Sequence, residues 1–250
     1  MIELKNAEEI QKIRESGVVL KALFQMLEEN IQAGMSTYDV DKLAHDFMKK
    51  NHVTGPCLGY YGYPNVTCIS VNDTIIHGIP SKKIILKDGD LVSVDITLDK
   101  DGFTTDSTHT YEIGKVSKEV HDLNVRTREA LYRGIEAAGK KGARVQDIAA
   151  AVENYIKPFG YGIVRDYCGH GVGFSIHEDP MIFNYVSPKN PNPKLREGMV
   201  IAIEPMITMG GSWKVKDMPD GWTVKTVDGS CACHWEHTVA ITADGAEIMT

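Results

Sequence analysis

A weak internal duplication constrains this chain more than any other feature of its sequence. "GMSTYDV" (34–40) matches "GARVQDI" (142–148), and "LKDGDLVSVDI" (86–96) matches "LREGMVIAIEP" (195–205). The two matches occur in the same order and at nearly the same separation, and the first segment of each copy leads into a stretch with helical periodicity. Either match alone could arise by chance, but the ordered pair favours a duplicated structural unit.

The unit is too long for a solenoid repeat, so we expect two copies packed face to face within a single domain. The halves are expected at roughly 1–115 and 116–250, each with a pair of helices followed by strands. Helices and hairpins segregated in this way predict an α+β architecture with a largely antiparallel sheet. A cleft along the pseudo-twofold axis would bring corresponding residues together, although such symmetry also allows them to lie far apart.

The first half contains a predicted hairpin, "VSVDITLDKDGFTTD" (92–106), that carries an acid on each arm. A turn centred between Lys100 and Asp101 would set Asp95 directly opposite Asp106. Opposed residues have Cβ atoms ~4.5–5.5 Å apart, and like charges facing each other destabilise a ladder. Two ionised carboxylates this close require a cation, a shared proton or water.

Strand periodicity places the acids of three segments on the less apolar face of each. Residues 91–98 put Asp95 opposite a wholly apolar row, and "IAIEP" puts Glu204 opposite two isoleucines. "WEHTVAIT" likewise puts Glu236 opposite a mostly apolar row. Acids exposed on edge strands are the plain alternative, but the recurrence, with Glu204 corresponding to Asp95 in the duplication, favours a shared inward-facing cluster.

Three histidines in Gly- or Pro-containing motifs are further candidates. His170 lies among small residues in "GHGVG", while His77 in "IHGIP" and His177 in "IHEDP" share the form Ile-His-x-x-Pro. A single histidine before a loop is more often a hydrogen-bonded structural residue. Together with four inward acids, however, these histidines favour a metal site.

Charge compensation favours two divalent cations at this site. Buried carboxylates alone would be driven to take up protons, because desolvation and like charge both disfavour ionisation. Two ions would neutralise four acids and could activate water at neutral pH. An oxygen-rich donor set with one imidazole suits manganese, iron or cobalt at least as well as zinc.

These motifs resemble those of the type I methionine aminopeptidases, which have the pita-bread fold. The resemblance covers essentially the whole chain and rests on "IIHGIP", "VDITLDKDGFTTDST", "YCGHGVGFSIHEDP", "IAIEPM", "DGWTVKT" and "WEHTVAIT". It implies removal of the initiator methionine from nascent chains whose second residue is small, by attack of a metal-activated hydroxide. The implied metal ligands are Asp95, Asp106, His170, Glu204 and Glu236.

The resemblance also implies a role for individual site residues. Asp106 and Glu236 would bridge the two ions, and Glu204 would accept a proton. His177 would hydrogen-bond the scissile carbonyl, and His77 would contact the amide on the leaving side.

A methionine pocket is implied within and beyond "CLGYYGYPNVTC", which by itself reads as an aromatic loop packed on the core. Its lining is apolar and tolerant of sulfur. Ile176 stands where bacterial relatives usually carry Phe, a change that could loosen the fit to methionine or shift inhibitor preference, although Ile still supplies an apolar wall. The other implied lining residues are Cys57, Tyr60, Tyr63, Cys68 and Trp222, with His77 and His177 at the mouth.

The composition limits which partners the protein is expected to bind and in which cellular compartment it is expected to work. A net charge of −7 argues against a general nucleic-acid binder, and no apolar run is long enough to span a bilayer. Five cysteines without a secretion signal predict free thiols in a reducing compartment. The chain resembles the minimal bacterial, cytoplasmic form, which implies a monomer that acts on nascent chains and meets the ribosome transiently.

Two other functions share parts of this pattern. An Xaa-Pro peptidase of the aminopeptidase P or prolidase kind would use a similar metal set but usually carries an extra N-terminal domain. A non-enzymatic binding module of the same fold typically loses metal ligands, whereas all five positions are present here. Activity on Met-Ala-Ser against Xaa-Pro peptides separates these readings.

Overall fold

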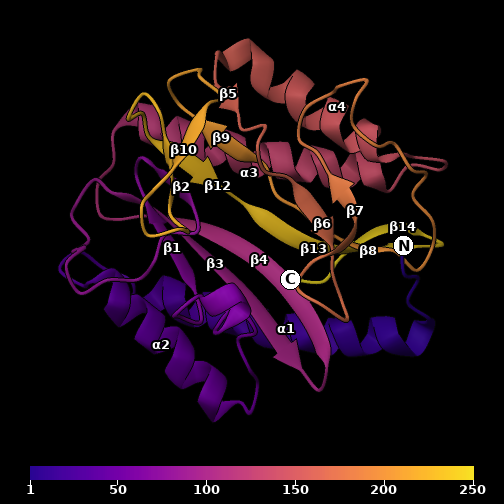
Figure 1. The fold of residues 1–250 in the computed structure, drawn as a ribbon, viewed down its shortest axis with the longest axis horizontal. Helices are drawn as coiled ribbons and strands as arrows, with labels where there is room; N and C mark the ends of the chain where they lie inside the picture. The colour runs from indigo at the N-terminus through magenta and orange to yellow at the C-terminus, as the bar shows by residue number, and fades with distance from the viewer.

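The computed structural model describes residues 1–250 and consists of one large antiparallel sheet with a pair of helices on the outer side of each half. Figure 1 shows α1 and α2 on one side of the molecule and α3 and α4 on the other, with the strands between them. The α+β architecture with a largely antiparallel sheet is therefore confirmed. The helices are α1 (Ala7–Asn30), α2 (Thr37–Lys50), α3 (Lys118–Ala138) and α4 (Val145–Ile156).

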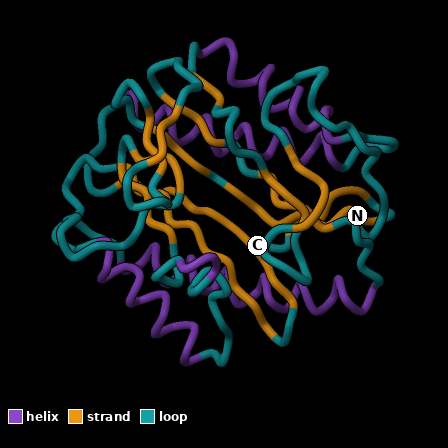
Figure 2. The backbone as a smooth tube through the Cα atoms, in the orientation of Figure 1, coloured by secondary structure: helices purple, strands orange, loops and turns teal.

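The large sheet has eight strands in the order β1-β3-β4-β13-β8-β6-β7, and β14 pairs with β13. These strands are β1 (Cys68–Val71), β3 (Leu91–Lys100), β4 (Phe103–Glu112), β6 (Gly169–Gly171), β7 (Glu178–Ile182), β8 (Val200–Ile203), β13 (Glu236–Thr242) and β14 (Gly245–Ile248). Two three-stranded sheets complete the fold; they contain β2 (Thr74–Ile76), β5 (Gly162–Ile163), β9 (Met206–Thr208), β10 (Val215–Asp217), β11 (Val224–Thr226) and β12 (Ala232–His234). Figure 2 shows that loops join these small sheets on one side of the molecule.

The outer faces of the strands form two separate cores. Val92, Val94 and Ile96 of β3 pack with α1 and α2, and Ile201 of β8 and Val239 of β13 pack with α3 and α4. The predicted division of these strands into an apolar face and a face with acids is confirmed. Because the apolar rows point outward to the helices, the opposite faces of the same strands turn inward.

The turns that precede α2 and α4 make matching contacts. The N–H of Ser36 donates to Asp39 at 2.8 Å, and the N–H of Arg144 donates to Asp147 at 2.7 Å, so each helix begins with its third residue capping the first turn. Each turn is also joined to a distant segment by an isolated antiparallel bridge, Ser36 with Ile85 and Arg144 with Lys194. The two halves thus position their second helices by the same local device.

Asn6 and Glu9 form a capping box at the start of α1. All five cysteines are free thiols. None of the helices combines the length and the apolarity that a membrane span requires.

Candidate metal centre and substrate pocket

The β3–β4 hairpin brings Asp95 and Asp106 to the same inner face, but not directly opposite each other. Asp95 pairs with Thr108, and Asp106 pairs with Thr97. The prediction of direct opposition is wrong: the turn is centred on Asp101–Gly102, one position later than expected, which moves the partner of Asp95 by two residues. Both turn residues have positive φ, at 56° and 84°, as a two-residue type I′ hairpin turn requires. The two carboxylates are therefore diagonal neighbours.

The seam between the two halves of the sheet adds Glu236 to this face. Strand β13 meets β4 through only two residue pairs, one of which is Glu236 with Thr108. The Thr108 hydroxyl donates to Glu236 Oε2 at 3.0 Å, and the Asp106 N–H donates to Thr238 Oγ1 at 2.8 Å. Backbone pairing and two threonine hydroxyls thus fix the positions of acids from both halves.

His170 faces these acids from β6. Its Nδ1 lies 2.8 Å from the carbonyl oxygen of Gly171, so Nδ1 carries the proton and donates it. Nε2 is left with a free lone pair and lies 3.7 Å from both Asp106 Oδ2 and Glu204 Oε1. A metal-binding imidazole is commonly oriented through a backbone hydrogen bond of this kind.

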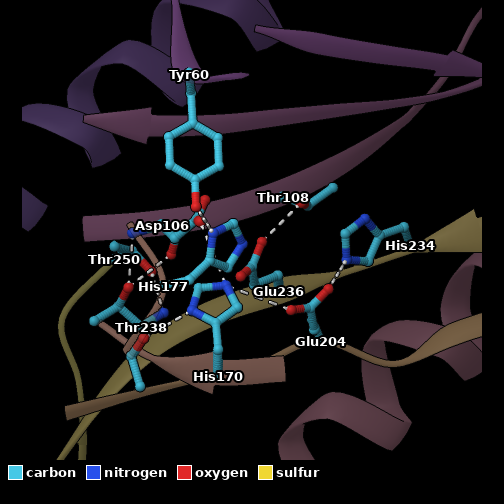
Figure 3. A network of polar contacts seen from close by, with 11 residues as sticks. Tyr60, Asp106, Thr108, His170, His177, Glu204, His234, Glu236, Thr238 and Thr250 are labelled. Atoms are coloured by element: carbon cyan, nitrogen blue, oxygen red, sulfur yellow. Dashed lines mark hydrogen bonds and ion pairs between the residues drawn. The ribbon is translucent and has the colours of Figure 1, made fainter. Parts of the chain in front are cut away.

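The donor atoms of Asp106, His170 and Glu236 all lie within 4.8 Å of one another, which is close enough to share a cation. Asp95 and Glu204 line the same small cavity, of about 90 Å³. Asp106 Oδ1 is buried without any hydrogen-bond partner. A buried carboxylate oxygen without a partner is costly, and a bound cation would supply the partner. Figure 3 shows Asp106, His170, Glu204 and Glu236 converging on this spot.

Burial and mutual repulsion disfavour ionisation of these acids unless positive charge is present. Burial, followed by the charges of Glu236, Asp95 and Glu204, raises the pKa of Asp106 well above its usual range. Burial followed by the charge of Asp95 does the same to the pKa of Glu204. The pKa of Glu236 is also raised well above its usual range, and that of Asp95 is raised, in both cases mainly by burial. The inner face is therefore suited to divalent cations, which favour the charged form of every acid.

His77 and His177 border both the acid cavity and a second cavity beside it. The ring of His177 lies 4.3 Å from that of His170, and its Nδ1 is 3.0 Å from the Tyr60 hydroxyl. Burial lowers the pKa of His177, and it lowers the pKa of His77 to about 4, so both imidazoles are neutral at pH 7. The backbone of His77 has a φ of 56°, an unusual value that marks this residue as held by its surroundings.

The second cavity, also about 90 Å³, contains the predicted pocket residues with one exception. Cys68 of β1 pairs directly with Asp95, so the pocket wall adjoins the acids. Tyr63 does not line this cavity. Because a buried tyrosine needs an internal acceptor, its hydroxyl donates to the carbonyl of Thr67. Its ring packs edge-on against Trp222, with ring centres 5.0 Å apart. The residues that do line the cavity include Cys57, Tyr60, Cys68, Ile176 and Trp222.

Sequence reasoning did not select His234, which the structure places in the acid cavity. The residue is 2% exposed, neither ring nitrogen makes a hydrogen bond, and Nε2 lies 3.3 Å from Glu204 Oε2. Burial lowers its pKa to about 4. Strand periodicity could have identified this residue, because His234 lies two positions before Glu236 and so falls on the same inward face.

Known proteins match this chain along its whole length. The model of metallopeptidase family M24 matches residues 11–243. Curated methionine aminopeptidases from Clostridium acetobutylicum and Borreliella burgdorferi are 44% and 45% identical, over 100% and 99% of this chain and 99% and 97% of their own lengths. The chain belongs to the methionine aminopeptidases of metallopeptidase family M24. It is therefore a metallo-aminopeptidase, and its family uses divalent metal.

Solved structures agree with this assignment. The crystal structure of methionine aminopeptidase from Rickettsia prowazekii has a TM-score of 0.95 at 34% identity, and each chain is fully covered. The enzyme from Thermotoga maritima also scores 0.95, at 39% identity, over 100% of this chain and 99% of the other. A prolidase from Pyrococcus furiosus scores 0.77 at 28% identity, and the match covers 99% of this chain but 65% of the prolidase. The pita-bread fold expected from the sequence is confirmed.

Proposed function

We propose that this enzyme hydrolyses the bond after an initiator methionine in nascent proteins and peptides whose second residue is small. The observation that carries the proposal is the junction of two cavities. The acid cavity and the Cys- and Trp-lined pocket share His77, His177, Asp95 and Asp106, so a side chain bound in the pocket holds its own peptide bond beside the acids. Sulfur and aromatic walls suit a thioether.

We infer that five residues would hold two divalent ions, and that Asp106 and Glu236 would serve both. The cluster of Asp106, His170 and Glu236 supports this assignment, as do the raised pKa values of the acids. When bound, the ions lower the pKa of water and polarise a carbonyl. The full set is Asp95, Asp106, His170, Glu204 and Glu236. Cobalt, manganese, iron and zinc all suit this donor set.

Glu204 is the proposed proton acceptor for the attacking water. It borders the acid cavity, and its second oxygen faces His234 rather than solvent. Its Oε1 lies 3.7 Å from His170 Nε2, in the cavity where bound ions would hold the carboxylate charged. From there the carboxylate can take a proton from water and return it to the departing amine.

His177 is the proposed donor to the carbonyl oxygen of the scissile bond. If the Tyr60 hydroxyl donates to His177 Nδ1, the single proton of the neutral ring resides on Nε2. An N–H donor fixed before substrate arrives stabilises the charge that develops on that oxygen. His77, which borders both cavities, is the proposed contact for the amide on the leaving side.

The substrates are proposed to be nascent N-termini that begin with methionine, met by a monomeric cytoplasmic enzyme in transient contact with the ribosome. We further propose that residues 1–250 form one catalytic domain built from the two matching halves. The matching contacts of the turns before α2 and α4 support this division into two halves.

Turnover of Met-Ala-Ser tests the activity after anaerobic reconstitution with each metal in turn. We expect hydrolysis with at least one of cobalt, manganese, iron or zinc, and complete, reversible loss on chelation. Ala-Pro peptides are the matched control, because an Xaa-Pro peptidase would prefer them. Preference for Ala-Pro, or turnover that survives thorough metal removal, would contradict the proposal.

A further inference from the structure

A buried ion pair lies next to the loop that carries Ile176 and His177. Lys5, only 3% exposed, places its Nζ on Glu178 Oε2, and the two side chains are 1% and 8% exposed. Lys5 Nζ also lies 4.9 Å from the centre of the Phe174 ring. A charge pair this deeply buried depends on both partners, because loss of one leaves the other charged and unsolvated.

The second carboxylate oxygen of Glu178 accepts hydrogen bonds from the backbone of the same loop. Oε1 accepts the backbone N–H groups of Phe174 and Ser175 at 2.6 and 3.0 Å. These residues form the tip between β6 and β7, and Glu178 itself pairs with Gly171 at the base of that tip. One carboxylate therefore fixes the backbone immediately before Ile176 and His177.

Two glycines leave room for the segment that brings Lys5 to this place. A Cβ on Gly173, where φ is +140°, would lie 2.7 Å from Lys5 Cε. A Cβ on Gly198 would lie 2.7 Å from the Lys5 carbonyl oxygen, and the Lys5 N–H donates to the Gly198 carbonyl at 2.7 Å. The N-terminal segment is thus seated against the loop by close backbone approach. Figure 1 shows this segment beside β8 and β14.

We propose that Lys5 is a positioning residue for hydrolysis, although it lies outside both substrate cavities. It neutralises Glu178, and Glu178 then holds the tip so that His177 and Ile176 keep their places against the substrate. Without the lysine, the buried carboxylate has no counter-charge and turns toward water, so the two backbone N–H groups lose their charged acceptor. The inference rests on the proposed function, because it assigns the loop a role in binding and in rate.

The decisive variant is Lys5→Met, which keeps much of the side-chain length and removes the charge. We expect kcat/KM on Met-Ala-Ser to fall by ~10²-fold, the scale of a misplacement of about 1 Å in a catalytic group. Metal stoichiometry measured by calorimetry should not change, because no proposed ligand is touched. Amide exchange of Phe174 and Ser175 in the native protein should accelerate, which a general loss of stability would not produce selectively.

Two controls separate positioning from folding. Arg14→Met breaks the ion pair between Arg14 of α1 and Glu247, which are 2.7 Å apart, and should leave kcat and KM near wild type. Lys5→Met combined with Glu178→Gln removes both charges but keeps an oxygen for the two N–H groups. This double variant, which folds without a buried unpaired charge, should recover most of the activity that Lys5→Met loses.

The outcomes are distinguishable. If Lys5→Met turns over like wild type while only its melting temperature falls, Lys5 is purely structural and the inference is overturned. If the double variant is no better than Lys5→Met, neutralisation of Glu178 is not the cause. If wild type cleaves no methionyl peptide with any metal, the proposed function fails, and the exchange comparison still reports whether Lys5 holds the loop.

Discussion

The two faces of the β4–β13 seam carry ionisable groups of opposite kinds. The inner face holds Asp106 and Glu236, whose pKa values are raised, and the outer face holds His109 and His237. Both histidines are neutral, because burial lowers the pKa of His109 to about 4 and that of His237 to about 3. Alternation along the same strands thus separates acids that require a cation from imidazoles that do not.

On the outer face, both imidazoles contact neighbouring protein side chains. The ring of His109 stacks on Phe24 of α1 with centres 4.0 Å apart, and His237 Nδ1 lies 3.1 Å from the Thr250 hydroxyl. By contrast, three of the four buried side-chain atoms that lack a partner belong to Asp106 and His234 on the inner face. Buried polar atoms without partners call for an explanation, and a bound cation would provide one for Asp106.

The strongest test of this contrast is Asp106→Asn, an inner-face change. We expect activity to fall by more than ~10³-fold, because the residue is proposed to serve both ions and the amide carries no charge. The metal-free variant should be at least as stable as metal-free wild type, since it buries one acid fewer. Calorimetric metal titration and urea unfolding measure the two effects. Full metal binding with normal turnover would remove Asp106 from the site.

A smaller effect is expected for His177→Ala, which leaves every proposed metal ligand in place. The rate should fall by ~10²–10³-fold, the usual cost of one donor to a developing oxyanion. Metal stoichiometry should stay at the wild-type value, which separates this variant from Asp106→Asn. An unchanged kcat would show that the contact with Tyr60 serves structure alone.

The smallest effect is expected on the outer face, for His109→Phe, which keeps a ring on Phe24. The unfolded histidine takes up a proton below pH ~6.5, whereas the native one stays neutral to about pH 4, so wild type loses stability as pH falls through this window. The variant should avoid a loss of up to ~1.4 kcal/mol per pH unit. Urea unfolding of chelated proteins between pH 7 and 4.5 measures the difference, and turnover at pH 7 should stay within about threefold of wild type.

Period-two patterning was sufficient to predict which faces carry Asp95, Glu204 and Glu236, because the apolar rows of these strands must pack on helices. It did not fix the hairpin register. "DKDG" offers two possible centres, and the choice depends on Asp101 and Gly102 adopting positive φ together. The local sequence therefore predicts which face of a strand a residue occupies more reliably than which residue it pairs with on the neighbouring strand.

The contributions of His234 and Tyr63 depend on tertiary context. His234 falls on the correct face, yet only the folded chain shows that its ring lies beside Glu204. Tyr63 belongs to a loop with several tyrosines, and the sequence does not distinguish those that line the cavity from those that pack behind it. Its hydroxyl finds acceptors at Thr67 and Gly78, which draws the ring behind Trp222 and away from the cavity.

The place of β13 in chain order bears on when a newly made molecule first becomes competent. This strand completes the sheet between β4 and β8, brings Glu236, and precedes only β14 along the chain. The acids of the first half therefore face an unpaired edge of β4 until β13 has been made and has paired with it. We therefore expect a newly made chain to lack peptidase activity until β13 inserts and adds Glu236 to the acid cavity.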